Sequence, residues 1–180
     1  MKKIIAVLLV ISFVLAAVSA CSSDNSKETD QGQTDIYKYL GDYDYDSSLL
    51  AFVYEPVDGE DESGIQYRKV TDIEGLLKSG KTVLLYFYNS MSSDVSGVTA
   101  GMEDIAQCTW GDMLVVTSDV LTDTDLATQY QIEKVPEFVM IRSSEEISRF
   151  EGYNYDVWSM SDVAAWVSSN GIKVDYSKLN

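Results

Sequence analysis

The residue types that most often carry out reactions in proteins are scarce in this chain. It contains no histidine and has two cysteines, Cys21 and Cys108. Without histidine the chain lacks the commonest general base, the usual partner of a serine or cysteine nucleophile, and a common metal ligand. The two cysteines are also too far apart in sequence to form a Cys-x-x-Cys motif, the arrangement that exchanges disulfides. We therefore expect no cofactor, no metal site and no catalytic residue, and we expect the chain to act by binding.

Cys21 ends an N-terminal segment that has the layout of a secretory signal. Lys2 and Lys3 precede an apolar run over residues 4–18, which is shorter than the roughly 20 residues of a membrane-spanning helix. The sequence Val18-Ser19-Ala20-Cys21 resembles the bacterial lipobox, in which the cysteine after the cleavage site receives a lipid. We expect residues 1–20 to be removed and Cys21 to hold the protein on the extracytoplasmic face of a bacterial cell membrane.

The charge of the chain limits its partners. With 13 basic and 29 acidic residues the formal charge is -16, and loss of Lys2 and Lys3 takes it to about -18. Such a surface repels phosphate groups, so nucleic acid is not an expected partner. If Cys21 is acylated, Cys108 has no partner for a disulfide within one molecule. The expected partners are the membrane, through the lipid, and a protein or peptide.

The remaining chain divides by composition and periodicity. Residues 21–35 are polar and predict a flexible tether, 36–64 an N-terminal extension with a strand at 49–54, and 171–180 a C-terminal tail. Between them, strands are predicted at 66–70, 82–88, 113–117, 138–141 and 147–150, the last two joined by a hairpin at Ser143-Ser144. A capping box at Thr71 to Glu74 predicts the start of a first helix, and helices are also predicted over 123–130, with an aspartate cap, and over 159–169. A further helix is predicted from five apolar residues that fall on one helical face: Val95, Val98, Met102, Ile105 and Ala106. The order βαβαβαββα predicts an α/β fold with a mixed sheet and helices on both faces.

This element order resembles the thioredoxin fold over residues 65–170. The run Lys81–Tyr88 leads into a helix as the family's second strand does, Pro136 matches its proline before the fourth strand, and Gly152 its glycine after the fifth. In that family the turn after Tyr88 holds Cys-x-x-Cys, and the corresponding residues here are Ser92, Ser93, Asp94 and Val95. Serine cannot form a mixed disulfide and valine cannot resolve one, so redox turnover at this turn is excluded on chemical grounds.

Other positions depart from the family in the same direction. Its buried aspartate corresponds to Tyr86 and its helix-kinking proline to Ala100. The glycines in that helix, Gly97 and Gly101, indicate either close packing or a tolerated defect. The resemblance implies a cis Val135-Pro136 bond, with two interpretations left open: backbone groups free to pair with an extended peptide, or a turn that blocks wrong strand pairing.

The expected binding face joins the turn and this proline. Its residues are Tyr88, Met91, Ser92, Ser93, Asp94, Val95, Val135 and Pro136. Two alternatives remain open: an accessory thiol-disulfide oxidoreductase or redox-linked chaperone acting through Cys108, and a weak calcium-binding acidic surface protein. The purely structural interpretation of Cys108 is a buried apolar residue. The alternating tyrosines over 37–45 indicate either a contact strip or the cover of a core edge.

Overall fold

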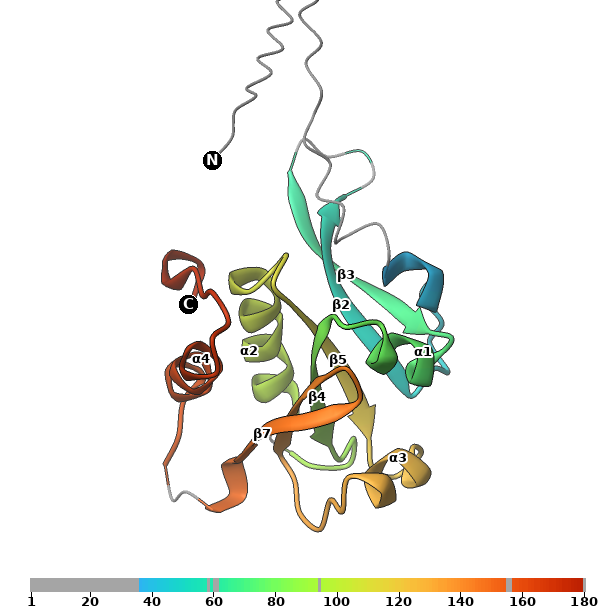
Figure 1. The fold of residues 1–180 in the computed structure, drawn as a ribbon, viewed down its shortest axis with the longest axis vertical. Coiled ribbons are helices and arrows are strands. Elements are labelled where there is room, and N and C mark those ends of the chain that lie inside the picture. Colours follow the sequence, from blue (N-terminus) through green and yellow to red (C-terminus); the bar gives the residue numbers. More distant parts are fainter. Residues whose placement is uncertain (1–35, 58, 60–61, 94, 155–156, 180) are drawn as a thin grey trace, which may run out of the picture.

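The chain forms one mixed sheet with helices on both faces, as the element order predicts (Figure 1). The computed structural model describes residues 36–57, 59, 62–93, 95–154 and 157–179. The strands are β1 (Leu40–Gly41), β2 (Leu49–Pro56), β3 (Ser63–Val70), β4 (Thr82–Tyr88), β5 (Met113–Asp119), β6 (Glu137–Arg142) and β7 (Glu145–Glu151). The helices are α1 (Ile73–Lys78), α2 (Val95–Cys108), α3 (Thr124–Gln129) and α4 (Met160–Ser169), with short 3₁₀ turns at Ile36–Tyr39, Gly152–Asn154 and Tyr176–Lys178.

The sheet has the strand order β1-β3-β2-β5-β4-β6-β7. Only β4 and β5 pair in parallel among the described strands, and the other neighbours are antiparallel. The central strands β4 and β5 are buried along almost their whole length, as their continuous apolar sequence predicts for strands covered on both faces. The strand β2, from the N-terminal extension, lies between β3 and β5 and pairs with both.

Each face of the sheet has its own apolar core. On one face Leu76 of α1 and Leu126 of α3 pack against the strands. On the other, Met102 of α2 and Val163 of α4 do so. Figure 1 shows α2 and α4 on one side of the strands and α1 and α3 on the other. We call these the α1/α3 face and the α2/α4 face.

Several predicted boundaries are confirmed. The strand over 82–88 has the predicted limits. The β6–β7 hairpin turns at Ser143 and Ser144, both with positive φ (53° and 67°), as a tight hairpin turn requires. The glycine Gly171, which follows α4, has a φ of +82°, as expected for a helix stop. The strand β3 is longer than predicted, because residues from Ser63 onward pair with β2.

One predicted helix cap is wrong, and a second has the predicted position without a side-chain cap bond. The cap of α1 is Asp72 and not Thr71: Asp72 Oδ1 accepts the amide of Gly75 at 2.8 Å, whereas the Thr71 hydroxyl donates to the carbonyl of Tyr39 at 2.9 Å. Asp123 stands at the N-cap position of α3 but makes no side-chain cap bond. Its carboxylate instead accepts from Ser48 at 2.5 Å, which ties α3 to the start of β2.

The glycine pair in α2 splits between the two predicted explanations. A Cβ on Gly101 would lie 2.3 Å from Met160 Cγ, so α2 and α4 approach closely there. A Cβ on Gly97 would have no neighbour within 4 Å. Within the described residues, no helix is both long and apolar enough to cross a membrane.

Candidate functional site

The turn between β4 and α2 is held by hydrogen bonds from its backbone amides. The Asn89 side chain accepts the amide of Met91 at 2.9 Å, and the Asn89 carbonyl accepts the amide of Ser92 at 2.9 Å. The amide of Ser90 donates to Asp119 Oδ1 at 3.3 Å, at the end of the neighbouring strand β5. These bonds place Ser92 at the mouth of a hollow beside α2.

This hollow, the turn pocket, has a volume of about 100 Å³. It is lined by Tyr86, Tyr88, Asn89, Ser92, Val95, Val98, Val135 and Pro136. The Val135-Pro136 bond is cis, as predicted. Gly152 lies behind the proline: a Cβ there would be 3.3 Å from Pro136 Cγ and 3.1 Å from the Trp158 ring. A larger residue than glycine would therefore crowd the loop that carries Pro136.

The structure brings together most of the predicted binding residues. Tyr88, Ser92, Val95, Val135 and Pro136 all line the turn pocket. Met91 and Ser93 do not line it, and the Met91 side chain is 85% exposed. Cys21 and Asp94 lie outside the described residues.

Sequence reasoning missed three lining residues. Tyr86 lies two residues before Tyr88 on the same face of β4, and Val98 lies one helical turn after Val95. These spacings are the signal that would have identified both. Asn89 is part of the turn itself. The side chains of Tyr86 and Val98 pack in the core and also line the pocket, so the apolar pattern alone assigns them to the core.

The pocket is aromatic and uncharged. The rings of Tyr86 and Tyr88 stack with centroids 5.4 Å apart, and Tyr86 stacks on Phe138 at 5.3 Å. Burial raises the pKa of Tyr86 to about 12, so its hydroxyl stays neutral at physiological pH. Burial also raises the pKa of Tyr88, and the nearby carboxylates of Asp119 and Asp123 add to that shift. The pocket therefore offers apolar surface and hydroxyl groups, which suit a peptide side chain.

None of the described side chains that line this pocket is a cysteine, a carboxylate or a lysine. No group of three cysteine, aspartate or glutamate side chains is placed to hold a metal ion in the described part of the chain. Cys108 lies at the opposite end of α2 from the turn and is 4% exposed. Its burial agrees with the structural interpretation of Cys108 as a buried apolar residue.

A protein-family model described as Thioredoxin matches residues 69–162, just over half of the chain. The chain belongs to the thioredoxin family. It is 30% identical over 79 residues to thioredoxin Y, a chloroplast protein of Oryza sativa subsp. japonica. That match covers 44% of this chain and 47% of the relative, so the chain spans about half the length of the curated relative.

Solved thioredoxin structures also resemble this chain. A mutant thioredoxin from Halobacterium salinarum has a TM-score of 0.48 and 20% identity, covering 58% of this chain and 88% of that one. The thioredoxin of Fasciola hepatica has a TM-score of 0.47 and 18% identity, covering 54% of this chain and 90% of its own. This thioredoxin-family chain has no Cys-x-x-Cys motif anywhere in its sequence.

Proposed function

We propose that this protein is a membrane-anchored, extracytoplasmic thioredoxin-like protein without redox activity, which binds a protein or peptide at the turn pocket. The observation that carries the proposal is the pocket itself. Ser92 and Val95, which stand where the family has its reactive cysteines, line a hollow together with Tyr88 and Pro136. The family's binding surface is therefore kept in a form that cannot exchange electrons.

The partner is a segment of polypeptide in extended conformation. Val135 and Pro136 lie at the rim of the pocket, immediately before β6, and an extended chain there can pair with backbone groups of Val135 while a side chain enters the pocket. The stacked rings of Tyr86 and Tyr88 favour an apolar or aromatic side chain at that point.

The anchor rests on the sequence around Cys21. Acylation of this cysteine keeps the domain at the membrane surface, and the polar residues 22–35 separate it from the lipid. Labelling cells with a fatty-acid analogue is expected to modify the wild-type chain and to leave Cys21→Ala unlabelled. Label retained by Cys21→Ala would contradict a lipid at this residue.

A photocrosslinking residue at position 91 tests the binding site in the cell. Met91 is exposed on the turn, so a crosslinker there is expected to trap the partner. The matched control is a crosslinker at Tyr176, which is 52% exposed but follows the segment that packs at the far end of α2. A product formed equally at both positions would mean that the turn is not the binding face.

Pocket variants then connect the product to the site. Pro136→Ala, introduced into the chain that carries the crosslinker at position 91, is expected to lose the product while keeping the circular-dichroism spectrum of the wild type. If the proline change disturbs folding, Ser92→Arg fills the pocket mouth from an exposed position and tests the same point. A folded variant that still captures the partner would reject the pocket.

An insulin reduction assay with dithiothreitol tests the loss of redox activity. The full chain is expected to leave the rate at the uncatalysed level, with a thioredoxin that has Cys-x-x-Cys as the positive control. Catalysis by this chain would overturn the proposal.

A further inference from the structure

A second hollow lies on the other side of Tyr88 and Val95 from the turn pocket. This hairpin groove has a volume of about 380 Å³ and lies between α2 and the strands β2, β3 and β5. Its lining includes Leu50, Phe52, Tyr67, Ala100 and Glu103, and it shares Tyr88 and Val95 with the turn pocket. Because the two hollows share Tyr88 and Val95, they adjoin each other, and one extended ligand can reach both.

The groove has an apolar base, and a hydrogen bond joins Tyr67 and Glu103 in its lining. Phe52 is 1% exposed, and its ring meets Tyr67 edge-on with centroids 4.9 Å apart. The Tyr67 hydroxyl donates to Glu103 of α2, which links β3 to the helix across the groove. Tyr43, in the loop before β2, lies against Tyr67 with ring centroids 6.2 Å apart and is 54% exposed. The aromatic surface therefore continues from the groove onto this loop.

The charge around the groove is negative. Glu103 is the only ionisable carboxylate that lines it, and no lysine or arginine does, among the residues described for it. Burial raises the pKa of the Tyr88 hydroxyl, and the carboxylates of Asp119 at the end of β5 and Asp123 at the start of α3 raise it further. The cations of β3 are already paired, Arg68 with Glu55 at 2.5 Å and Lys69 with Asp44 at 2.8 Å.

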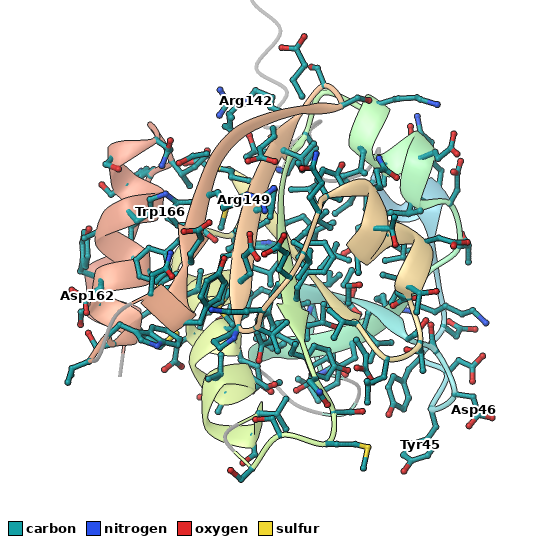
Figure 2. All side chains as sticks on the ribbon, turned by 90° about the horizontal axis from the view of Figure 1, so that it is seen from below. Tyr45, Asp46, Arg142, Arg149, Asp162 and Trp166 are labelled. Carbon is teal, nitrogen blue, oxygen red and sulfur yellow. The ribbon has the colours of Figure 1, made fainter. Side chains whose placement is uncertain are left out.

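The exposed loop beside the groove has three further carboxylates, of which Asp42 pairs with Arg68 and Asp44 with Lys69. Residues 42–46 read Asp-Tyr-Asp-Tyr-Asp, and Tyr45 is 87% exposed. Figure 2 shows Tyr45 and Asp46 projecting outward at one edge of the molecule, away from α4 with Trp166 and Asp162. Tyrosine faces and carboxylates together attract lysine and arginine side chains. A second copy of this acidic chain, or an anionic lipid surface, would be repelled here.

We propose that the hairpin groove binds an apolar side chain of an extended, positively charged peptide whose neighbouring part occupies the turn pocket. This inference rests on the proposed function and specifies its partner: a basic and apolar polypeptide segment. The base of Phe52 and Leu50 takes the apolar side chain, and Glu103 and the loop 42–46 face its lysine or arginine neighbours. The hairpin β2–β3 thus gives the protein a binding surface beyond the turn.

Synthetic peptides of defined charge test the partner class. The probes are fluorescent peptides of alternating leucine and lysine, leucine and glutamate, or serine and lysine, titrated into the full chain in a neutral detergent. The leucine-lysine peptide is expected to bind at least about tenfold more tightly than either of the others, because it alone combines apolar burial with opposite charge. Equal binding of the leucine-glutamate peptide would overturn the charge assignment, and equal binding of the serine-lysine peptide would overturn the apolar one.

Two arginine substitutions on one helix test the location. Ala100 is exposed and lines the groove, whereas Gly97 is exposed, lines neither hollow and has open space for a side chain. Ala100→Arg is expected to weaken binding of the leucine-lysine peptide by about tenfold or more, through loss of apolar burial. Gly97→Arg carries the same added charge and is expected to weaken it by less than about threefold. Equal losses would mean unspecific attraction and would overturn the proposal.

A carboxylate pair tests the charge contact. Glu103→Gln can still accept the Tyr67 hydroxyl, and it is expected to weaken the peptide by about two- to fivefold. Glu74→Gln removes an equal charge from the exposed surface of α1 and is expected to leave binding unchanged. Equal effects of the two changes would contradict a role for Glu103.

The turn-pocket variant separates the two proposals. If Met91→Ala/Pro136→Ala releases the leucine-lysine peptide and Ala100→Arg does not, the groove inference fails and the proposed function stands. If only Ala100→Arg releases it, the groove stands and the turn pocket is not the binding site. If neither does, both fail.

Discussion

The ion pair between Glu137 and Arg149 is the most deeply buried charge contact of the described residues. The Glu137 side chain is 1% exposed, and Arg149 donates to its Oε1. Arg149 also donates to Glu146 at 2.7 Å and to the carbonyl of Tyr130 at 2.9 Å, so one guanidinium joins β6, β7 and the end of α3. Glu137 Oε2 is buried without a hydrogen-bond partner in the described structure. This carboxylate depends on Arg149 for its charge compensation.

Replacing Arg149 with methionine is expected to destabilise the protein by about 3–5 kcal/mol at neutral pH, because it leaves a buried carboxylate unpaired. Urea unfolding measures the loss. Arg142→Met is the matched control: Arg142 is exposed at the end of the same hairpin, donates to Thr82 at 2.9 Å and should cost under about 1 kcal/mol (Figure 2). A similar cost for both variants would contradict the special role of Arg149.

The pH dependence of the Arg149→Met variant gives a second measurement. Burial raises the pKa of Glu137 above its ordinary value, while Arg149 acts in the lowering direction. Without Arg149 the folded-state pKa rises further, so the variant loses stability, relative to wild type, as the pH rises from the wild-type folded-state pKa through the higher folded-state pKa of the variant. The deficit is therefore smaller at pH 5 than at pH 7.5. In Glu137→Gln/Arg149→Met this difference should vanish.

Cys108 is expected to react slowly in the folded protein. Burial raises the pKa of its thiol, and Asp104 and Asp175 shift it in the same direction. Both the small thiolate fraction and the lack of access lower the rate of alkylation. In Cys21→Ala, iodoacetamide at pH 8 should label Cys108 at least about tenfold more slowly in buffer than in urea. Fast labelling of the native protein would favour the alternative in which Cys108 is a redox residue.

An exposed cysteine calibrates that measurement. Ser93 is exposed on the turn, so Ser93→Cys in a Cys21→Ala/Cys108→Ala background should react at similar rates in buffer and urea. If the exposed thiol is also protected, the slow rate of Cys108 does not come from its burial.

At the scale of elements, the close approach of α2 and α4 decides what Gly101 can become. Gly101→Ala is expected to destabilise the protein. Overlap of the new methyl group with Met160 costs about 1–3 kcal/mol, and the higher helix propensity of alanine offsets roughly 1 kcal/mol of that cost. Gly97→Ala gains the same helix propensity and meets no neighbour, so it should stabilise by up to about 1 kcal/mol. Thermal and urea unfolding should give opposite signs for the two. Stabilisation by both would show that Met160 yields without cost.

The elements that sequence predicts well are those whose own residues determine them. The limits of β4 follow from an uninterrupted apolar run between Lys81 and Asn89, and the β6–β7 turn from two serines between alternating strands. The place of β2 in the sheet could not be predicted in this way. Its apolar run indicates a strand, but pairing with both β3 and β5 is decided by contacts between segments far apart in the chain.

The differences at the caps of α1 and α3 also come from contacts with distant segments. Thr71 and Asp72 are both good capping residues, and the choice between them depends on the Tyr39 carbonyl, which lies in a separate segment and takes the Thr71 hydroxyl. Asp123 has the right position in α3, yet Ser48 draws its carboxylate away from the helix. Local preference cannot register a partner that tertiary structure supplies.

The residues that the family resemblance marks individually are the ones that the structure brings together. Tyr88, Val95 and Pro136 come from that resemblance, and they line the turn pocket. Met91 belongs to the expected binding face, but its amide donates to the Asn89 side chain and its own side chain is 85% exposed. The direction of a side chain in a turn follows from such hydrogen bonds, which residue type alone does not predict.

At the scale of the whole molecule, the excess of carboxylates sets both stability and choice of partner. With a formal charge of -16, the folded chain brings like charges closer together than the unfolded chain does. Some of this repulsion is offset by ion pairs such as Lys69 with Asp44 and Lys78 with Glu74, the latter on an exposed helix surface. Surface pairs of this kind contribute little, so repulsion should dominate the long-range electrostatics.

Salt is therefore expected to stabilise the protein. Raising sodium chloride from 20 to 500 mM shortens the screening length from roughly 20 Å to about 4 Å, which weakens repulsion across the surface more than contact between paired groups. At pH 7.5 the unfolding midpoint of the full chain should rise by a few degrees. Near pH 4, where about half of the carboxylates are protonated, the same salt step should have little effect. A midpoint that falls with salt at pH 7.5 would mean that the ion pairs, including Arg149 with Glu137, outweigh the net charge, and would weaken the case that acidity selects a basic partner.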